Sequence, residues 1–114
     1  MKDQLYLLKP GFFNQEKGPF FCPGCAYVEG MLSFYPELRD KIEVHYLDFP
    51  RPRQVLVALI GADNQGAPKL VLGDSAEATP EDIVVHTYND KKFIADPREI
   101  CKFLAAKFGV GTPH

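Results

Sequence analysis

The sequence predicts a single α/β domain over residues 1–114, with its elements in the order β-α-β-α-β-β-α. Three observations support this fold class. Residues 5–8 form a continuous apolar run, which is typical of a strand buried on both faces. From Cys22 onward, apolar residues recur at spacings of three and four until Pro36, as on one face of a helix. Residues 42–47 then alternate between apolar and polar side chains, which indicates a second strand.

The rest of the chain supplies the other elements, some with clear end signals. The clearest start signal belongs to the last helix: Asp96 can cap it, Pro97 suits its first position, and Glu99 stands three residues after the cap. Residues 9–21 contain four phenylalanines and are expected to form a loop packed against the domain. The remaining predicted elements are a helix over residues 54–60, a strand over 69–72, a short helix beginning at Thr79, a strand over 92–95 and the last helix, closed by Gly109.

Composition excludes several classes of function. A chain of 114 residues with 46% hydrophobic and 25% charged residues can bury a core of its own. No apolar run approaches the ~20 residues that cross a bilayer, so we expect no membrane association. A net charge of -2 without a basic cluster argues against nucleic acid as a partner. The apolar run near the N-terminus is too short for a secretory signal, so we expect a cytoplasmic protein.

Two of the three cysteines form the motif Cys22-Pro23-Gly24-Cys25 at the start of the first predicted helix. Two thiols at this spacing can close a disulfide reversibly, or can present two thiolates to a metal ion. An odd cysteine count makes a structural disulfide framework unlikely. A zinc site would need two more ligands from residues scattered along the chain, so we predict no metal and no cofactor. Those scattered residues are His45, His86, Cys101 and His114.

A second anchor lies further along the chain. Ala67-Pro68 comes directly before the predicted strand at 69–72, and Pro68 is 43 residues past Cys25 (68 − 25). Together with Cys22-Pro23-Gly24-Cys25 and the order of elements, this resembles the thioredoxin-like superfamily. More narrowly it resembles a small bacterial thioredoxin-like family of uncharacterised function. The resemblance implies a mixed four-stranded sheet flanked by helices, with Pro68 as a cis-proline facing the cysteine pair.

The resemblance also implies roles for individual residues. Cys22, at the N-terminal end of its helix, would be the nucleophile, and Cys25 would resolve the mixed disulfide. The chain would then be a thiol–disulfide oxidoreductase whose partner is a protein or small-molecule thiol or disulfide. The substrate-binding positions implied around the pair are Phe21, Pro23, Ala67 and Pro68.

Two departures from thioredoxins keep other functions open. Phe21 stands where thioredoxins have tryptophan, and the first strand contains no acid, whereas thioredoxins bury an aspartate there. A non-catalytic thioredoxin-like module that binds a partner or senses redox state is therefore an alternative. A metal site at the Cys-x-x-Cys pair is a further one. The sequence indicates neither the substrate nor the oligomeric state.

Overall fold

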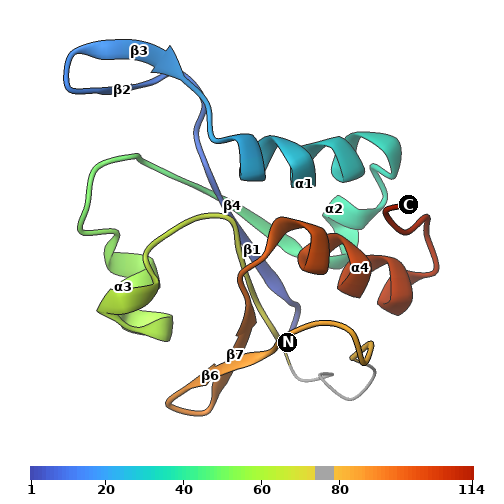
Figure 1. Cartoon of the computed structure of the whole chain (residues 1–114). Coiled ribbons are helices and arrows are strands. Elements are labelled where there is room, and N and C mark those ends of the chain that lie inside the picture. Colours follow the sequence, from blue (N-terminus) through green and yellow to red (C-terminus); the bar gives the residue numbers. More distant parts are fainter. Residues whose placement is uncertain (74–78) are drawn as a thin grey trace.

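The computed structural model describes residues 1–73 and 79–114, which form an α/β domain around a mixed five-stranded sheet (Figure 1). The strand order is β4-β1-β5-β7-β6. β1 pairs with β4 in parallel, and the other neighbours are antiparallel. The strands of this sheet are β1 (Gln4–Leu8), β4 (Glu43–Leu47), β5 (Lys69–Val71), β6 (His86–Tyr88) and β7 (Lys91–Ile94).

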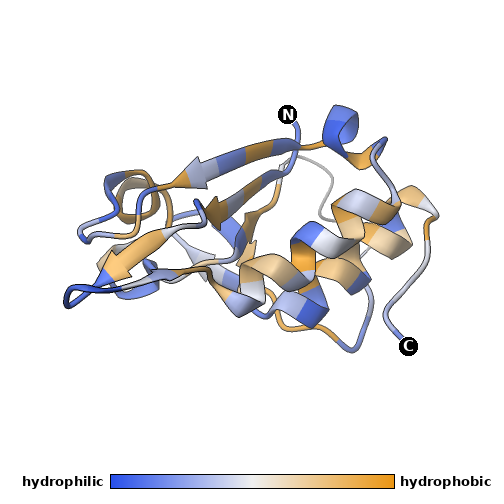
Figure 2. Cartoon of the chain, turned by 90° about the horizontal axis from the view of Figure 1, so that it is seen from above, coloured by the Kyte–Doolittle hydropathy of each residue, from blue (hydrophilic) through white to orange (hydrophobic). Residues whose placement is uncertain are grey.

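Helices cover both faces of the sheet. They are α1 (Pro23–Phe34), α2 (Leu38–Lys41), α3 (Gln54–Ile60) and α4 (Pro97–Phe108), with a 3-10 helix η1 at Ala62–Asn64. α1 and α4 pack side by side on one face, and α3 covers the other (Figures 1 and 2). The apolar run of β1 serves both layers, because Leu5 and Leu7 join the core under α1 and α4 while Tyr6 packs with α3. This confirms the predicted double burial of the first strand.

Residues 9–21 do not form the expected loop. They form a hairpin of β2 (Phe12–Asn14) and β3 (Lys17–Phe20), which projects from the body of the domain beside the start of α1 (Figure 1). Its turn is built by Gln15 and Glu16, both with positive φ (52° and 64°). Gly, Asn and Asp are the residues that usually take these values, so this turn lacks a sequence signal.

Two further expectations were wrong. The sheet has five strands rather than four, because β6 joins β7 through a turn at Asn89 and Asp90 and forms an outer edge. The short helix expected at Thr79 is absent, since residues 81–83 form a turn and bend instead. The least regular part of the sequence, residues 73–91, also includes residues 74–78, which lie outside the described residues.

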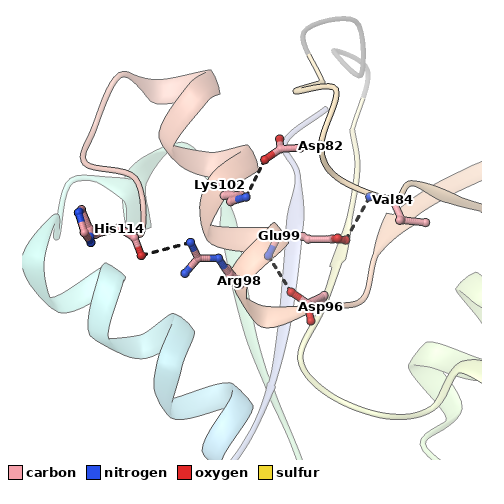
Figure 3. A network of polar contacts seen from close by, with 7 residues as sticks. All are labelled: Asp82, Val84, Asp96, Arg98, Glu99, Lys102 and His114. Atoms are coloured by element: carbon pink, nitrogen blue, oxygen red, sulfur yellow. Dashed lines mark hydrogen bonds and ion pairs between the residues drawn. The ribbon is translucent and has the colours of Figure 1, made fainter.

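The start of α4 ties the segment around residues 82–84 to the domain (Figure 3). Asp96 caps the helix as predicted, accepting a hydrogen bond from the Glu99 N–H (3.0 Å). The Glu99 carboxylate accepts a hydrogen bond from the Val84 N–H (3.1 Å). One turn further, Lys102 pairs with Asp82 at 2.6 Å. The acid three residues after the cap thus anchors a neighbouring segment of the chain.

The N-terminal residues are fixed by one buried carboxylate. Asp3 is only 1% exposed and accepts hydrogen bonds from Lys107 Nζ and the Gly73 N–H, both at 2.7 Å. It therefore joins the residues before β1, those after β5 and the last turn of α4. A buried ion pair that is also hydrogen-bonded holds these three elements in a fixed arrangement.

Candidate functional site

Cys22 is the N-cap residue of α1. Its backbone is extended (φ −80°, ψ 116°), and its Sγ accepts a hydrogen bond from the Cys25 N–H at 3.2 Å. Pro23 takes the first helical position, where a missing N–H costs nothing. The sulfur is partly exposed and sits at the positive end of the helix dipole. These features suit a sulfur that carries negative charge during a reaction.

Cys25 lies one turn into α1 and is buried, with 3% of its surface exposed. Its Sγ accepts a hydrogen bond from the Leu8 N–H at 3.4 Å, so the end of β1 contacts the second sulfur. Burial, followed by interaction with Cys22, raises the pKa of Cys25 from 9.0 to about 12. Cys22, Cys25 and Cys101 are not joined by a disulfide in this structure. Cys25 is therefore a protected neutral thiol next to an accessible sulfur.

The Ala67–Pro68 peptide bond is cis, as expected, and it faces the pair. The Cys22 thiol lies 3.6 Å from the Ala67 carbonyl oxygen, which can accept its hydrogen. Gly24 makes this approach possible: a Cβ added there would lie 3.1 Å from Pro68 Cδ and 3.0 Å from Pro97 Cγ. The glycine of the motif thus lets the start of α1 pack closely between two prolines.

A groove of about 250 Å³ opens directly beside the two sulfurs. The exposed ring of Phe21 (62%) lines it, and the hairpin that leads to Phe21 carries two more exposed rings, Phe13 (60%) and Phe20 (43%). Phe12 of the same hairpin is held in place by stacking on Phe49, with centroids 4.3 Å apart. The groove residues are Leu8, Pro10, Phe21, Cys22, Cys25, Ala26 and Glu29. Phe21 and both cysteines thus meet at this groove.

The other candidate ligands lie apart from the pair. His45, in β4, stacks on Tyr6 with ring centroids 4.8 Å apart. His86, in β6, stacks on Phe93 with ring centroids 5.2 Å apart. Cys101 is 2% exposed in α4 and lines a different cavity together with His114. Within residues 1–73 and 79–114 there is no group of three or more His, Cys, Asp or Glu side chains that could hold a metal ion. In the same described residues, no helix combines the length and apolar character needed to span a bilayer.

Two basic residues that the sequence did not single out lie on the segments around Pro68. Arg53, just before α3, and Lys69, directly after Pro68, are each only 8% exposed. Both interact electrostatically with the Cys25 thiol. The sequence offered one weak signal, because Lys69 interrupts an apolar strand right after the second anchor.

Comparison with known proteins places the chain in a family. Residues 2–112 match the family described as "Protein of unknown function (DUF3088)". The chain belongs to this family. No curated protein and no solved structure matches it. The DUF3088 match covers nearly the whole chain, including both cysteines and Pro68, and its description carries no function, so function has to be argued from the site itself.

Proposed function

We propose that this DUF3088 protein is a thiol–disulfide oxidoreductase with a thioredoxin-like fold. The observation that carries the proposal is the arrangement of Cys22: it caps α1, binds the Cys25 N–H through its sulfur, and faces the cis peptide at Ala67-Pro68. Four strands in the order β4-β1-β5-β7, with a helix leaving β1 at the pair, support the thioredoxin-like fold. β2, β3 and β6 are additions to that frame.

The proposed reaction is disulfide exchange in two steps. The Cys22 thiolate attacks one sulfur of a partner disulfide, forming a mixed disulfide and releasing the other partner sulfur as a thiolate that takes up a proton. Cys25 then loses its proton and attacks the Cys22 sulfur. The bond between Cys22 and the partner breaks, and its electron pair leaves on the partner sulfur. The pair is oxidised to a disulfide and the partner is reduced to two thiols; run backward, the same steps oxidise a dithiol partner.

The site supports binding of a partner near the reacting sulfurs. Phe21 and Pro23 are exposed at the start of α1, and the Ala67 carbonyl lies beside Cys22. We place Phe21, Pro23, Ala67 and Pro68 around the bound partner, which can be a protein or a small-molecule disulfide. An odd number of cysteines argues against a disulfide framework and fits a reducing compartment, so we propose that this exchange takes place in the cytoplasm.

Counting thiols tests the proposal. The reduced chain, denatured after incubation with oxidised dithiothreitol, is expected to lose two of its three thiols. Cys22→Ser and Cys25→Ser should lose none, whereas Cys101→Ala should still lose two. Cys25→Ser should also trap a partner on Cys22 as a stable mixed disulfide. A parent protein that keeps all three thiols at equilibrium with oxidised dithiothreitol and oxidised glutathione would overturn the proposal.

A second candidate is a binding or redox-sensing module without turnover. The exposed aromatic rings of the hairpin, Phe13 and Phe20, favour it, because exposed apolar side chains that lie close together are typical of docking surfaces. The two candidates differ in turnover. Catalytic reduction of insulin disulfides that depends on Cys22 supports the oxidoreductase, and a disulfide that forms only stoichiometrically supports the sensor.

A further inference from the structure

Two buried cations lie around Pro68, whose neighbour Ala67 contacts the Cys22 thiol, and among the described residues neither has a carboxylate partner. Arg53 and Lys69 are each 8% exposed. Within the part of the chain that the structure describes, neither forms an ion pair with Asp or Glu. Basic side chains are almost never buried to this degree unless they are paired. Their positive charge therefore needs another explanation.

Backbone carbonyls hold both side chains in place. Arg53 Nε and Nη2 donate to the Phe49 carbonyl at 3.1 and 2.6 Å, and Nη1 donates to the Gln65 carbonyl at 2.7 Å. Lys69 Nζ donates to the Gly66 carbonyl at 2.8 Å. These bonds hold the Arg53 and Lys69 side chains against the segments that precede α3 and β5. A carbonyl carries no net charge, so the positive charges stay uncompensated.

The groups with which these charges interact are the two thiols. Burial, then the neighbouring Arg51, lowers the pKa of Arg53, while Cys25 and Cys22 act to raise it. Burial also lowers the pKa of Lys69, with Arg51 and Arg53 adding to the effect and Cys25 opposing it. Arg53 in turn acts to lower the pKa of Cys25, against the larger effect of burial. Each interaction favours a thiolate.

Other charged groups near the groove are engaged elsewhere. Glu29 lines the groove, but it forms an ion pair with Arg39 at 2.8 Å and accepts a hydrogen bond from the Tyr46 hydroxyl at 2.8 Å. Lys9 and Asp48 form an exposed pair at 3.0 Å. Among these groups, the charge left to act on Cys25 is therefore positive.

We propose that Arg53 and Lys69 are positioning residues that stabilise the Cys25 thiolate when Cys25 resolves the mixed disulfide. This inference rests on the proposed oxidoreductase function. The Cys25 proton leaves to solvent, the thiolate attacks the Cys22 sulfur, and the partner sulfur departs with the electron pair and takes up a proton. A buried thiol alone makes this step slow at neutral pH, because few molecules carry the thiolate. Two fixed cations raise that fraction without opening the site to water.

The small disulfide 5,5′-dithiobis(2-nitrobenzoate) separates the two steps. In a Cys101→Ala background, attack by Cys22 releases one coloured thiolate and resolution by Cys25 releases the second. Lys69→Gln keeps a donor for the Gly66 carbonyl and removes the charge, while Lys69→Arg keeps the charge. We expect Lys69→Gln to slow the second release roughly tenfold and to move its pH profile upward, because the Cys25 thiolate loses a neighbouring positive charge. The first release should change less than twofold, and Lys69→Arg should resemble the background protein.

The outcomes separate this inference from the proposed function. If the background protein gives no second release, the oxidoreductase proposal fails with it. If Lys69→Gln and Arg53→Gln both give the second release at the rate of the background protein, the inference fails and the oxidoreductase proposal stands. If Lys69→Gln and Lys69→Arg slow the second release equally, the cause is lost packing rather than lost charge. That result would also overturn the inference. Should Lys69→Gln not fold by circular dichroism, Arg53→Gln and Arg53→Lys make the same comparison.

Discussion

The third cysteine gives a prediction whose sign reverses with pH. Cys101 is 2% exposed, and burial raises its pKa from 9.0 to about 11. Between these values the folded chain keeps the Cys101 proton and the unfolded chain loses it, so the free energy of unfolding falls as pH rises. Two pKa units amount to about 2.7 kcal/mol in full, and about 2 kcal/mol is already lost at pH 10.5. Cys101→Ala removes this loss.

The same substitution also removes a packed sulfur, at a cost of about 1 kcal/mol at every pH. Cys101→Ala should therefore be less stable than the parent by about 1 kcal/mol at pH 7.5 and more stable by about 1 kcal/mol at pH 10.5, with equality near pH 9.5 to 10. Urea unfolding of both proteins at these two pH values, with a phosphine reductant present, measures the two differences. Contributions from Cys25 and Lys69 are common to the two proteins and cancel in the difference. A difference that stays constant between the two pH values would refute the reasoning.

The other stability predictions concern a buried ion pair and two glycines of α1. Asp3→Ala leaves Lys107 Nζ without its carboxylate and should cost about 3–5 kcal/mol in urea unfolding; a loss below about 1 kcal/mol would contradict the anchoring role. Gly30→Ala should stabilise the chain by about 0.5–1 kcal/mol, because an added Cβ meets nothing within 4 Å. Gly24→Ala should gain nothing or lose about 1 kcal/mol, because its Cβ would press on two prolines at 3.0 and 3.1 Å. Equal stabilisation by both alanines would rule out close packing at the motif.

The core of the fold could be predicted from the sequence because local signals agreed there with tertiary packing. The apolar run of β1 is buried on both sides, and the bounds of α3 are those expected, Gln54–Ile60. Asp96 caps α4 as its spacing indicated. Each of these elements combines a hydrophobic period with an end signal, so one pattern fits one structure.

The peripheral strands could not be predicted for the opposite reason. β6 is three residues long with every side chain exposed, so it has no buried face to leave a pattern. The hairpin β2–β3 turns through Gln15 and Glu16 rather than through residues that favour positive φ. Its phenylalanines pointed to packing, and Phe12 does pack on Phe49, but Phe13 remains exposed.

The candidate site divides in the same way. Cys22, Cys25 and Pro68 could be found because the motif and its spacing are local features. Arg53 and Lys69 could not, because their burial arises only when the loop before α3 meets the loop before β5. The neighbours of Arg53 along the chain give no sign of its burial, and for Lys69 the one weak sign is its place at the start of an apolar strand.

The position of Cys25 sets a physical requirement on any exchange at this site. Burial protects the reduced thiol and raises its pKa to about 12, so the thiolate that must attack Cys22 is scarce at neutral pH. A buried acid could remove the proton, but the four buried positions of β1 hold only Leu5, Tyr6, Leu7 and Leu8. Stabilising the thiolate with fixed positive charge is the other physical solution. Arg53, at the N-cap of α3, and Lys69, at the start of β5, are the two buried cations that we propose for this role.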